Sequence, residues 1–243
     1  MLNVLDKDNL TSKEVKGLVK RYLDLQEYIK SAINDTPTNN IEITRAKKQK
    51  SEIEQILSMH AKKDKVTDWA SSIPGIGVVL GCGIVAYIEG VKTVNEMYTL
   101  AGFVPRNRYK DGEYSVDFKR IGCKIGECFV GTADNEHDIY GHIYKYRRNY
   151  EMEKNDRYEY SAQAENVLAK NGRNPAAKNY KWHIQGKLSP SHIRMRARRY
   201  AVKIFLQHLF CVYDEVRNGR KSNNVVSVIM DKEFTVPIPG WNG

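Results

Sequence analysis

The segment Ser189–Val212, SPSHIRMRARRYAVKIFLQHLFCV, changes from basic to apolar within one helical pattern. Ser189 followed by Pro190 is typical of a helix start, because serine caps free N–H groups and proline fits the first turn. In the first half arginines flank a single apolar stripe, whereas from Ile204 onward apolar residues point in every direction, as in a buried helix. We therefore expect a final helix whose second half is anchored in the core and whose first half presents charge.

The net positive charge of the chain is concentrated around this helix. Residues 173–221 contain twelve Lys or Arg and two acids, an excess of ten, and the formal net charge of the whole chain is +10. Arginine held on a folded platform suits phosphate, since its planar fork binds two oxygens at once. A nucleic acid is therefore the expected ligand. The expected contact residues in this region are Lys181, Trp182, His183, His192, Arg194, Arg196, Arg198, Arg199 and Lys203.

A second basic cluster lies between residues 106 and 124, where cations alternate with aromatic residues. Nucleic-acid bases stack on such rings while Lys and Arg hold the backbone, although a solvated loop would show the same pattern. Gly112 and Gly122 favour a loop or a short ribbon here rather than a long helix. The expected contact residues of this cluster are Arg106, Arg108, Tyr109, Lys119, Arg120 and Lys124.

Residues 1–62 have the pattern of two amphipathic helices joined by a turn. Thr11 and Glu14 form a capping box, and apolar residues then recur at three- and four-residue steps as far as Ile33. Residues 34–40 break the pattern before a second, more polar helix. We expect an antiparallel hairpin of the coiled-coil kind. Its narrow apolar stripe fits either dimerisation, which we expect, or ordinary packing on the core.

The segment IPGIG, residues 73–77, follows a basic linker and matches a helix-hairpin-helix turn. Gly75 and Gly77 would permit a tight backbone, and the N-terminus of the next helix would offer free N–H groups to a phosphate. The same turn also serves in some folds only to pack helices. Residues 78–88 form a helix rich in small residues, which indicates the close approach of a neighbouring helix.

The remaining segments complete an all-α prediction. Residues 139–168 form a tyrosine-rich helical stretch, and residues 63–221 together make the expected nucleic-acid-binding domain. Residues 222–243 are expected to be a loose C-terminal tail, with a strand-like part at 225–229 and a loop-like part at 237–241.

No catalytic, metal or cofactor site is expected. The four cysteines have neither C-x-x-C spacing nor a disulfide framework, and Cys82 and Cys211 fit core positions. The acid cluster at 134–138, followed by His142, lies at a helix start, where Asp and Glu commonly cap N–H groups. The nucleophile elbow, the phosphate-binding P-loop and the dinucleotide fingerprint do not occur in the sequence.

Composition indicates a globular chain outside the membrane. The 243 residues are 41% hydrophobic and 28% charged, which is enough to bury a core. Apolar runs fall short of the roughly 18 residues that a membrane span needs. Residues 1–7 lack the basic and apolar regions of a signal peptide. We expect a cytoplasmic protein.

Three motifs resemble those of a known family. IPGIG at 73–77, LAGFVPR at 100–106 and KRIG at 119–122 are similar to the C-terminal domain of the bridge-RNA-guided serine transposases of insertion sequences. A helical hairpin before such a domain resembles the Nop domain of box C/D ribonucleoproteins. The whole layout, with the basic helix from His192 to Leu209, looks like the Tas proteins of TIGR (tandem interspaced guide RNA) systems, which are compact RNA-guided proteins of phages and small bacterial genomes. The resemblance runs from about Thr11 to Arg220.

This resemblance implies a homodimeric ribonucleoprotein that holds a short structured guide RNA and directs it to complementary target DNA. Where the transposases place a nucleophilic serine, this chain has Lys110-Asp111-Gly112, with Ser115 displaced. The acidic nuclease-like domain of the transposases and the RuvC-like or HNH modules of some Tas proteins have no counterpart in these residues. We therefore expect a protein without nuclease activity of its own, and whether it recruits a separate nuclease partner stays open. The resemblance also implies that the protein acts in the cytoplasm of a bacterium or of a phage-infected host cell. Two alternatives remain: a minimal serine recombinase that uses Ser115, and a phage protein that binds duplex DNA through the 73–77 turn.

Overall fold

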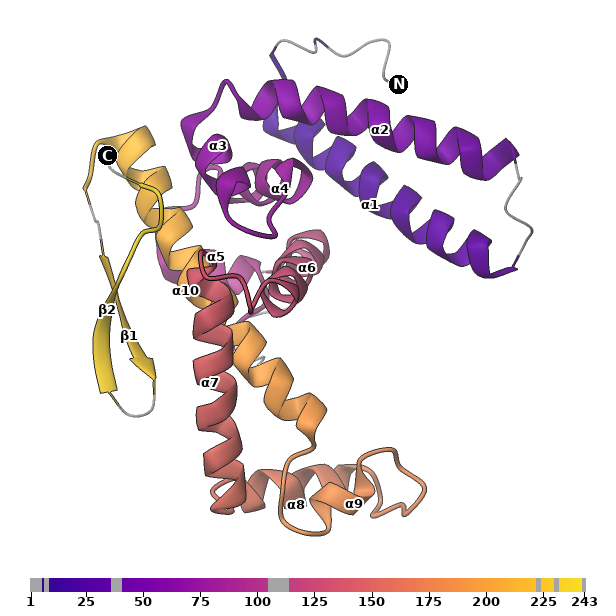
Figure 1. Ribbon diagram of the computed structural model, residues 1–243, viewed down its shortest axis with the longest axis vertical. Coiled ribbons are helices and arrows are strands. Elements are labelled where there is room, and N and C mark those ends of the chain that lie inside the picture. The colour runs from indigo at the N-terminus through magenta and orange to yellow at the C-terminus, as the bar shows by residue number, and fades with distance from the viewer. Residues whose placement is uncertain are drawn as a thin grey trace.

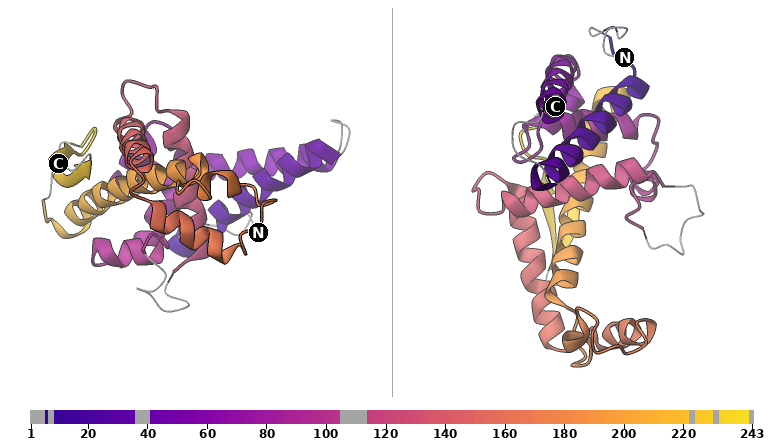
Figure 2. Two further views of the ribbon diagram at one scale, coloured as in Figure 1. Left: turned by 90° about the horizontal axis from the view of Figure 1, so that it is seen from below. Right: turned by 90° about the vertical axis from the view of Figure 1, so that its right-hand side faces the viewer.

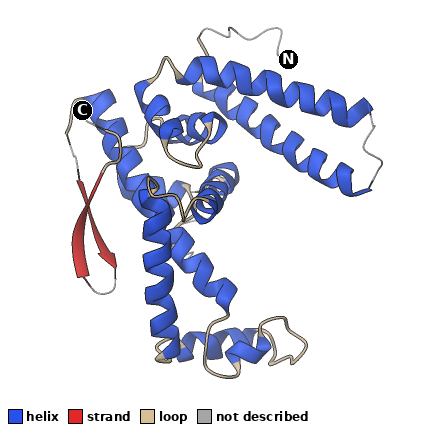
Figure 3. Ribbon diagram, in the orientation of Figure 1, coloured by secondary structure: helices blue, strands red, loops and turns tan. Residues whose placement is uncertain are grey.

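The computed structural model describes Asp6 and residues 9–35, 41–104, 114–221, 224–229 and 232–241. The described elements are α1 (Ser12–Asp35), α2 (Ile41–Ala61), α3 (Lys65–Ser72), α4 (Val78–Ile88), α5 (Val94–Leu100), α6 (Val116–Gly131), α7 (Ile139–Asp156), α8 (Ser161–Lys170), α9 (Tyr180–His183), α10 (Pro190–Asn218), β1 (Asn224–Ile229) and β2 (Lys232–Pro237). The predicted all-α fold is confirmed, and the described strands are confined to one C-terminal hairpin (Figure 3). None of the described helices is both long and apolar enough to cross a bilayer.

The long helices α7 and α10 lie side by side and form a stem (Figure 1). The α1–α2 hairpin projects from one end of the molecule. Helices α8 and α9 with their loops, residues 157–189, project from the other end, and we call them the arm (Figure 2). Helices α3, α4 and α6 fill the space between the hairpin and the stem. The surfaces between α7, α10 and the arm therefore belong to one end of the molecule.

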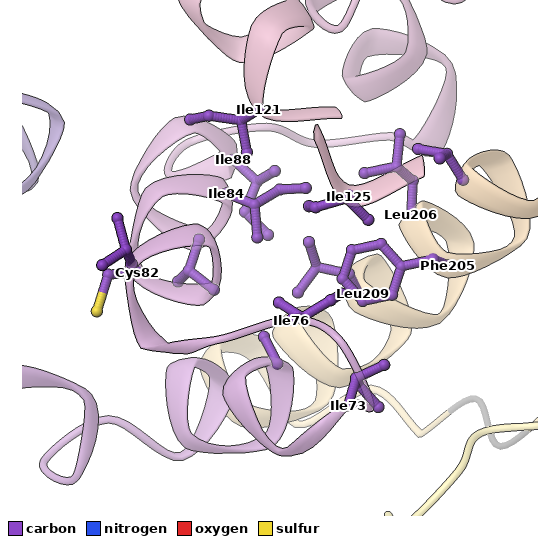
Figure 4. Close-up of a cluster of buried hydrophobic side chains, with 14 of the residues drawn as sticks. Ile73, Ile76, Cys82, Ile84, Ile88, Ile121, Ile125, Phe205, Leu206 and Leu209 are labelled. Atoms are coloured by element: carbon purple, nitrogen blue, oxygen red, sulfur yellow. The ribbon is translucent and has the colours of Figure 1, made fainter. Parts of the chain in front are cut away.

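The hairpin packs on the core of the same chain. One continuous cluster of buried side chains extends from Leu10 at the start of the hairpin to Ile238 after β2. A Cβ added at Gly83 of α4 would lie 2.9 Å from Val19 Cγ1, so the two helices touch at a residue without a side chain. The close approach predicted for residues 78–88 is confirmed. In Figure 4, Ile84 and Ile88 of α4 and Ile125 of α6 point toward Phe205 and its neighbours in α10.

The prediction of a loop or ribbon around Gly122 is wrong, because α6 is a 16-residue helix that begins at Val116. Its glycines serve packing. A Cβ at Gly122 would lie 2.9 Å from Phe103 Cζ, and one at Gly126 would lie 2.6 Å from Arg198 Cγ. Local sequence alone cannot distinguish a glycine required by a neighbouring helix from a glycine that ends one.

The tyrosine-rich stretch 139–168 is two helices and not one. Helix α7 ends at Asp156, and Tyr158 has a φ of +60°, which turns the chain into α8. The amide of Asn155 fixes this end of the stem: its Oδ1 accepts from Leu188 N at 2.8 Å and its Nδ2 donates to Leu188 O at 3.1 Å. Buried Ala164, Leu188 and Ile193 form a small second cluster there. The arm therefore contacts the stem through a few apolar side chains and through the two hydrogen bonds between Asn155 and Leu188.

Helix α10 begins where its sequence predicts. Ser189 Oγ accepts from His192 N at 3.4 Å, and Gly219, with a φ of +71°, ends the helix. Its buried half carries His208, whose ring nitrogens lie 2.8 Å from Tyr140 Oη and 3.2 Å from Val236 O. Because the carbonyl of Val236 can only accept, Nε2 carries a proton, and in the neutral ring Nδ1 then accepts from the Tyr140 hydroxyl. Burial lowers the pKa of His208 to about 4.

The C-terminal tail is docked, so the expectation of a loose tail is wrong. The predicted strand 225–229 pairs with β2 in an antiparallel ladder that places Val225 opposite Val236. Trp69 Nε1 donates to Pro239 O at 2.8 Å, and Trp241 Nε1 donates to Glu215 Oε2 at 2.9 Å. These contacts join segments that are far apart in the sequence, and for that reason the local pattern did not predict them.

Candidate nucleic-acid interface

The stem has two flanks, and the phase of its helices decides which arginines lie on each. Ile193, Ala197 and Ala201 of α10 are buried. Successive helical residues are about 100° apart, so Arg194 and Arg196 lie about 200° apart around the axis. They consequently lie on different flanks of the stem, although only one residue separates them in the sequence.

On one flank, two arginines share a single buried carboxylate. Glu151 of α7 is 1% exposed, and its oxygens accept from Arg147 Nη2 at 2.7 Å and from Arg196 Nε at 2.5 Å. Tyr160 Oη of the arm donates to the same carboxylate at 2.6 Å. The guanidinium of Arg147 also lies over the ring of Tyr200. We call this set, Arg147, Glu151, Tyr160 and Arg196, the glutamate cluster.

The glutamate cluster stays ionised. Burial alone raises the pKa of Glu151, but the hydrogen bonds from Tyr160 and Arg196 and the charges of both arginines outweigh it, so the pKa lies below its ordinary value. Arg196 is therefore a structural residue that ties α10 to α7 and to the arm.

The other flank holds a pocket of about 190 Å³. It is lined by Arg148, Met152, Asn155 and Asp156 of α7, Trp182 of α9, the loop residues Lys187 and Leu188, and Pro190, Ile193 and Arg194 of α10. Leu188 and Ile193 are buried and form its apolar base, whereas the two arginines are exposed. We call this the open pocket.

The two arginines of the open pocket differ from those of the glutamate cluster. Within the described part of the chain, Arg148 and Arg194 have no hydrogen-bond or ion-pair partner. The third cation, Lys187, is paired with Asp156 at 2.8 Å. The half-buried ring of Trp182 completes the lining, and the ammonium of Lys181 lies 5.5 Å from its centre. Two unneutralised guanidinium groups next to an accessible indole offer charge for phosphate and a face for a base.

The remaining predicted residues of the C-terminal region divide between exposed and engaged positions. Arg199 is exposed and has no partner among the described residues. Arg198 crosses Gly126 and contacts Glu127 at 3.3 Å, while the ammonium of Lys203 lies 5.0 Å from the centre of the Tyr98 ring. His192 is half-buried, with its Nε2 3.4 Å from Gln163 Nε2. His183 is buried, and burial lowers its pKa, so this residue does not present a charge to a ligand.

The predicted cations of α6 connect this helix to the N-terminal hairpin. Arg120 pairs with Asp24 at 2.7 Å and with Glu27 at 2.8 Å, and Lys124 lies 3.9 Å from Glu27. Lys119 lies over the ring of Tyr114, 5.4 Å from its centre. Because acids of α1 pair with Arg120 and Lys124, these two predicted contact residues present less positive charge to a ligand. Arg106, Arg108 and Tyr109 lie outside the described residues.

Only one of the two glycines of the 73–77 turn adopts a backbone conformation that favours glycine, because Gly77 has a φ of −76°. Gly75 has a φ of +82°, and a Cβ there would lie 3.0 Å from Cys128 Cβ, so the turn packs closely on α6. Gly77 is the N-cap of α4 and supplies no side chain, which leaves the first N–H groups of α4 facing a cavity of about 450 Å³. Glu54 and Glu127 line this cavity together with Lys124. The geometry supports helix packing, and the two carboxylates disfavour a phosphate.

The candidate catalytic residues cap helices. Asp138 Oδ1 accepts from Tyr140 N at 3.0 Å at the start of α7, as the sequence predicted. Ser115 Oγ accepts from Phe118 N at 3.2 Å at the start of α6. Cys82 is buried, which raises the pKa of its thiol to about 12. Among the residues that the structure describes, His, Cys, Asp and Glu form no cluster that would hold a metal.

Sequence reasoning missed Arg148, Met152 and Lys187, although all three line the open pocket. A signal for Arg148 was present: it follows Arg147 in a tyrosine-rich helix, and Met152 lies four residues later on the same face. The sequence could not predict that Arg147 is paired while Arg148 has no partner among the described residues, because this depends on how Glu151 lies relative to α10 in the folded chain.

Comparisons with protein-family models, with curated proteins and with solved structures found no match to this chain.

Proposed function

We propose that this chain is an RNA-binding protein that holds a short structured guide RNA and directs it to complementary DNA, without nuclease activity of its own. The observation that carries RNA binding is the pair Arg148 and Arg194, both exposed and unpaired within the described chain, beside Trp182. On the opposite flank, Arg147 and Arg196 are both paired with the buried carboxylate of Glu151. A surface that leaves arginines unneutralised next to an aromatic ring suits phosphate and base together.

RNA fits this surface better than duplex DNA. Sequence-specific RNA recognition uses loops and single-stranded segments whose unstacked bases lie against aromatic and arginine side chains. A recess beside Trp182 would accept such a base, whereas the bases of a regular duplex remain stacked. The competing site for duplex DNA, the N-terminus of α4, opens on a cavity that Glu54 and Glu127 line.

The guide role rests on the resemblance of the 73–77, 100–106 and 119–122 motifs to RNA-guided proteins. In such a system base pairing selects the DNA while the protein binds shape and backbone, and a separate nuclease would supply any cleavage. We extend the proposal to a homodimer formed through the free end of the hairpin. That end exposes Tyr28, Ile33 and Ile41, of which Ile41 is 77% exposed. Light scattering should then report a dimer, and Ile41→Lys should shift it toward monomer.

The direct test is purification from cells that carry the native locus, followed by a salt wash and sequencing of the bound nucleic acid. A discrete short RNA with uniform ends supports the proposal. Protein free of nucleic acid, or random RNA removed by moderate salt, contradicts it. The Arg148→Ala/Arg194→Ala double variant gives a second test: it should retain the fold and co-purify with much less RNA.

A further inference from the structure

We propose that the open pocket binds one unstacked nucleobase, which stacks on Trp182 while Arg148 and Arg194 bind the adjoining phosphates. This inference rests on the proposed RNA-binding function and names the part of the ligand that one site recognises. It identifies the ligand as a single-stranded nucleotide within an RNA.

The size of the open pocket favours a single base. Its volume of about 190 Å³ is below the roughly 300–1,000 Å³ of pockets that enclose drug-sized ligands. A planar base would enter it, while the ribose and the phosphates would remain outside at the two arginines. The buried side chains of Leu188 and Ile193 give the open pocket an apolar lining that suits an aromatic heterocycle.

The pocket is held in shape by contacts that do not involve a ligand. The two hydrogen bonds between Asn155 and Leu188 fix the loop against α7. The ion pair of Lys187 with Asp156 closes one side, and Trp182 O accepts from Lys187 N at 3.1 Å. These bonds join α7, α9 and the loop before α10, so the backbone segments that carry the indole and the guanidinium groups are fixed relative to one another. A preformed site lowers the ordering cost of binding.

The same contacts leave little hydrogen-bonding capacity for reading the base edge. Both polar atoms of the Asn155 amide are used by Leu188, and the carboxylate of Asp156 is paired with Lys187. Stacking and charge remain, and these tolerate any base. The site should therefore anchor an unpaired nucleotide of the RNA with only weak preference for its identity.

The experiment measures fluorescence anisotropy of labelled oligouridylate and oligoadenylate, each about ten nucleotides long, with an RNA duplex for comparison. Wild-type protein should bind both single strands with similar affinity and more tightly than the duplex. Trp182→Ala should weaken binding by about five- to one-hundred-fold, the loss expected for one stacked base. Trp182→Phe keeps a stacking ring and should retain most of the affinity.

Two controls separate the site from the fold. Arg157→Ala removes an exposed cation of the arm that is paired with Glu159, and it should bind RNA like wild type. Wild-type tryptophan emission should fall as single-stranded RNA is added, and this fall should be much smaller in Trp182→Phe, which retains Trp69 and Trp241.

The outcomes distinguish the two proposals. If wild-type protein binds no RNA, the proposed function fails and this inference fails with it. If wild-type protein binds RNA while Trp182→Ala and Arg148→Ala/Arg194→Ala bind equally well, the function stands and the nucleotide site is overturned. Preference for the duplex over both single strands would also overturn it.

Discussion

The two flanks of the α7–α10 stem use the same residue type for different purposes. On one flank, Arg147 and Arg196 share the buried carboxylate of Glu151 and connect the stem to the arm. On the other, Arg148 and Arg194 border the open pocket, and neither arginine has an acid partner among the described residues. A run of arginines is thus not one binding surface. Helix phase divides it into residues that hold the fold and residues available to a ligand.

The largest expected effect comes from removing the shared carboxylate. Glu151→Gln leaves two guanidinium groups without their counter-charge in a half-buried setting, and it should lower the free energy of unfolding by about 3 kcal/mol. Urea denaturation measures the loss. The control Glu153→Gln changes an exposed acid of the same helix and should stay within about 0.5 kcal/mol of wild type. Equal effects of the two substitutions would remove the structural role assigned to the glutamate cluster.

Acid pH should weaken the buried half of α10 before it affects the glutamate cluster. His208 has an ordinary pKa of 6.5 and a pKa of about 4 in the folded protein. Between these two values the unfolded chain binds a proton at His208 and the folded protein does not. Stability should fall by about 2 kcal/mol between about pH 7 and about pH 5. Glu151 has a lowered pKa, so its contribution persists through this range and is lost only at lower pH.

Urea midpoints across this pH range test the assignment to His208. His208→Gln should flatten the dependence, whereas Tyr140→Phe removes the bonded hydroxyl, keeps the titrating ring and should retain the slope. An unchanged slope in His208→Gln would show that other groups cause the acid loss.

A matched pair of double variants compares the two flanks in RNA binding. Arg148→Ala/Arg194→Ala should weaken binding to single-stranded RNA by about tenfold and leave stability unchanged. Arg147→Ala/Arg196→Ala should instead lower stability. Each lost phosphate contact reduces the slope of log K against log salt by about 0.7, so the first pair should flatten it by about 1.4. Anisotropy titrations from about 50 to about 200 mM salt provide the slopes. Identical slopes in both variants would contradict the division between the flanks.

The smallest effect is expected at an exposed pair on the arm. Arg157 and Glu159 lie 2.8 Å apart with both side chains accessible to water. Arg157→Ala should leave both the unfolding midpoint and the affinity for RNA unchanged, because solvent screens such pairs. A clear loss of affinity would show that the RNA footprint extends beyond the open pocket onto the arm.

Local signals predicted much of the fold. The capping box at Thr11, the Ser189–Pro190 start of α10 and the strand 225–229 depend on neighbouring residues, and all three are confirmed. Gly122 was misread because its partner, Phe103, comes from another element. The docked tail was missed for the same reason.

The candidate site was predicted less completely than the fold. The sequence indicated Arg194 and Trp182, and the structure places both at the open pocket. It also indicated Arg196 and Arg120, which are paired with Glu151 and Asp24 across long sequence separations. Charge density is local, but neutralisation depends on tertiary contacts. The sequence therefore predicted which region is basic and could not predict which cations are free.

The most direct test of RNA binding on the open flank is ultraviolet cross-linking of the protein to its co-purified RNA, with mass spectrometry of the linked peptides. Cross-links should concentrate in the peptides that contain Trp182 and Arg194 and in the segment of α7 around Arg148. Cross-links confined to the 73–77 turn and the start of α4 would contradict this account and favour the α4 N-terminus as the nucleic-acid site.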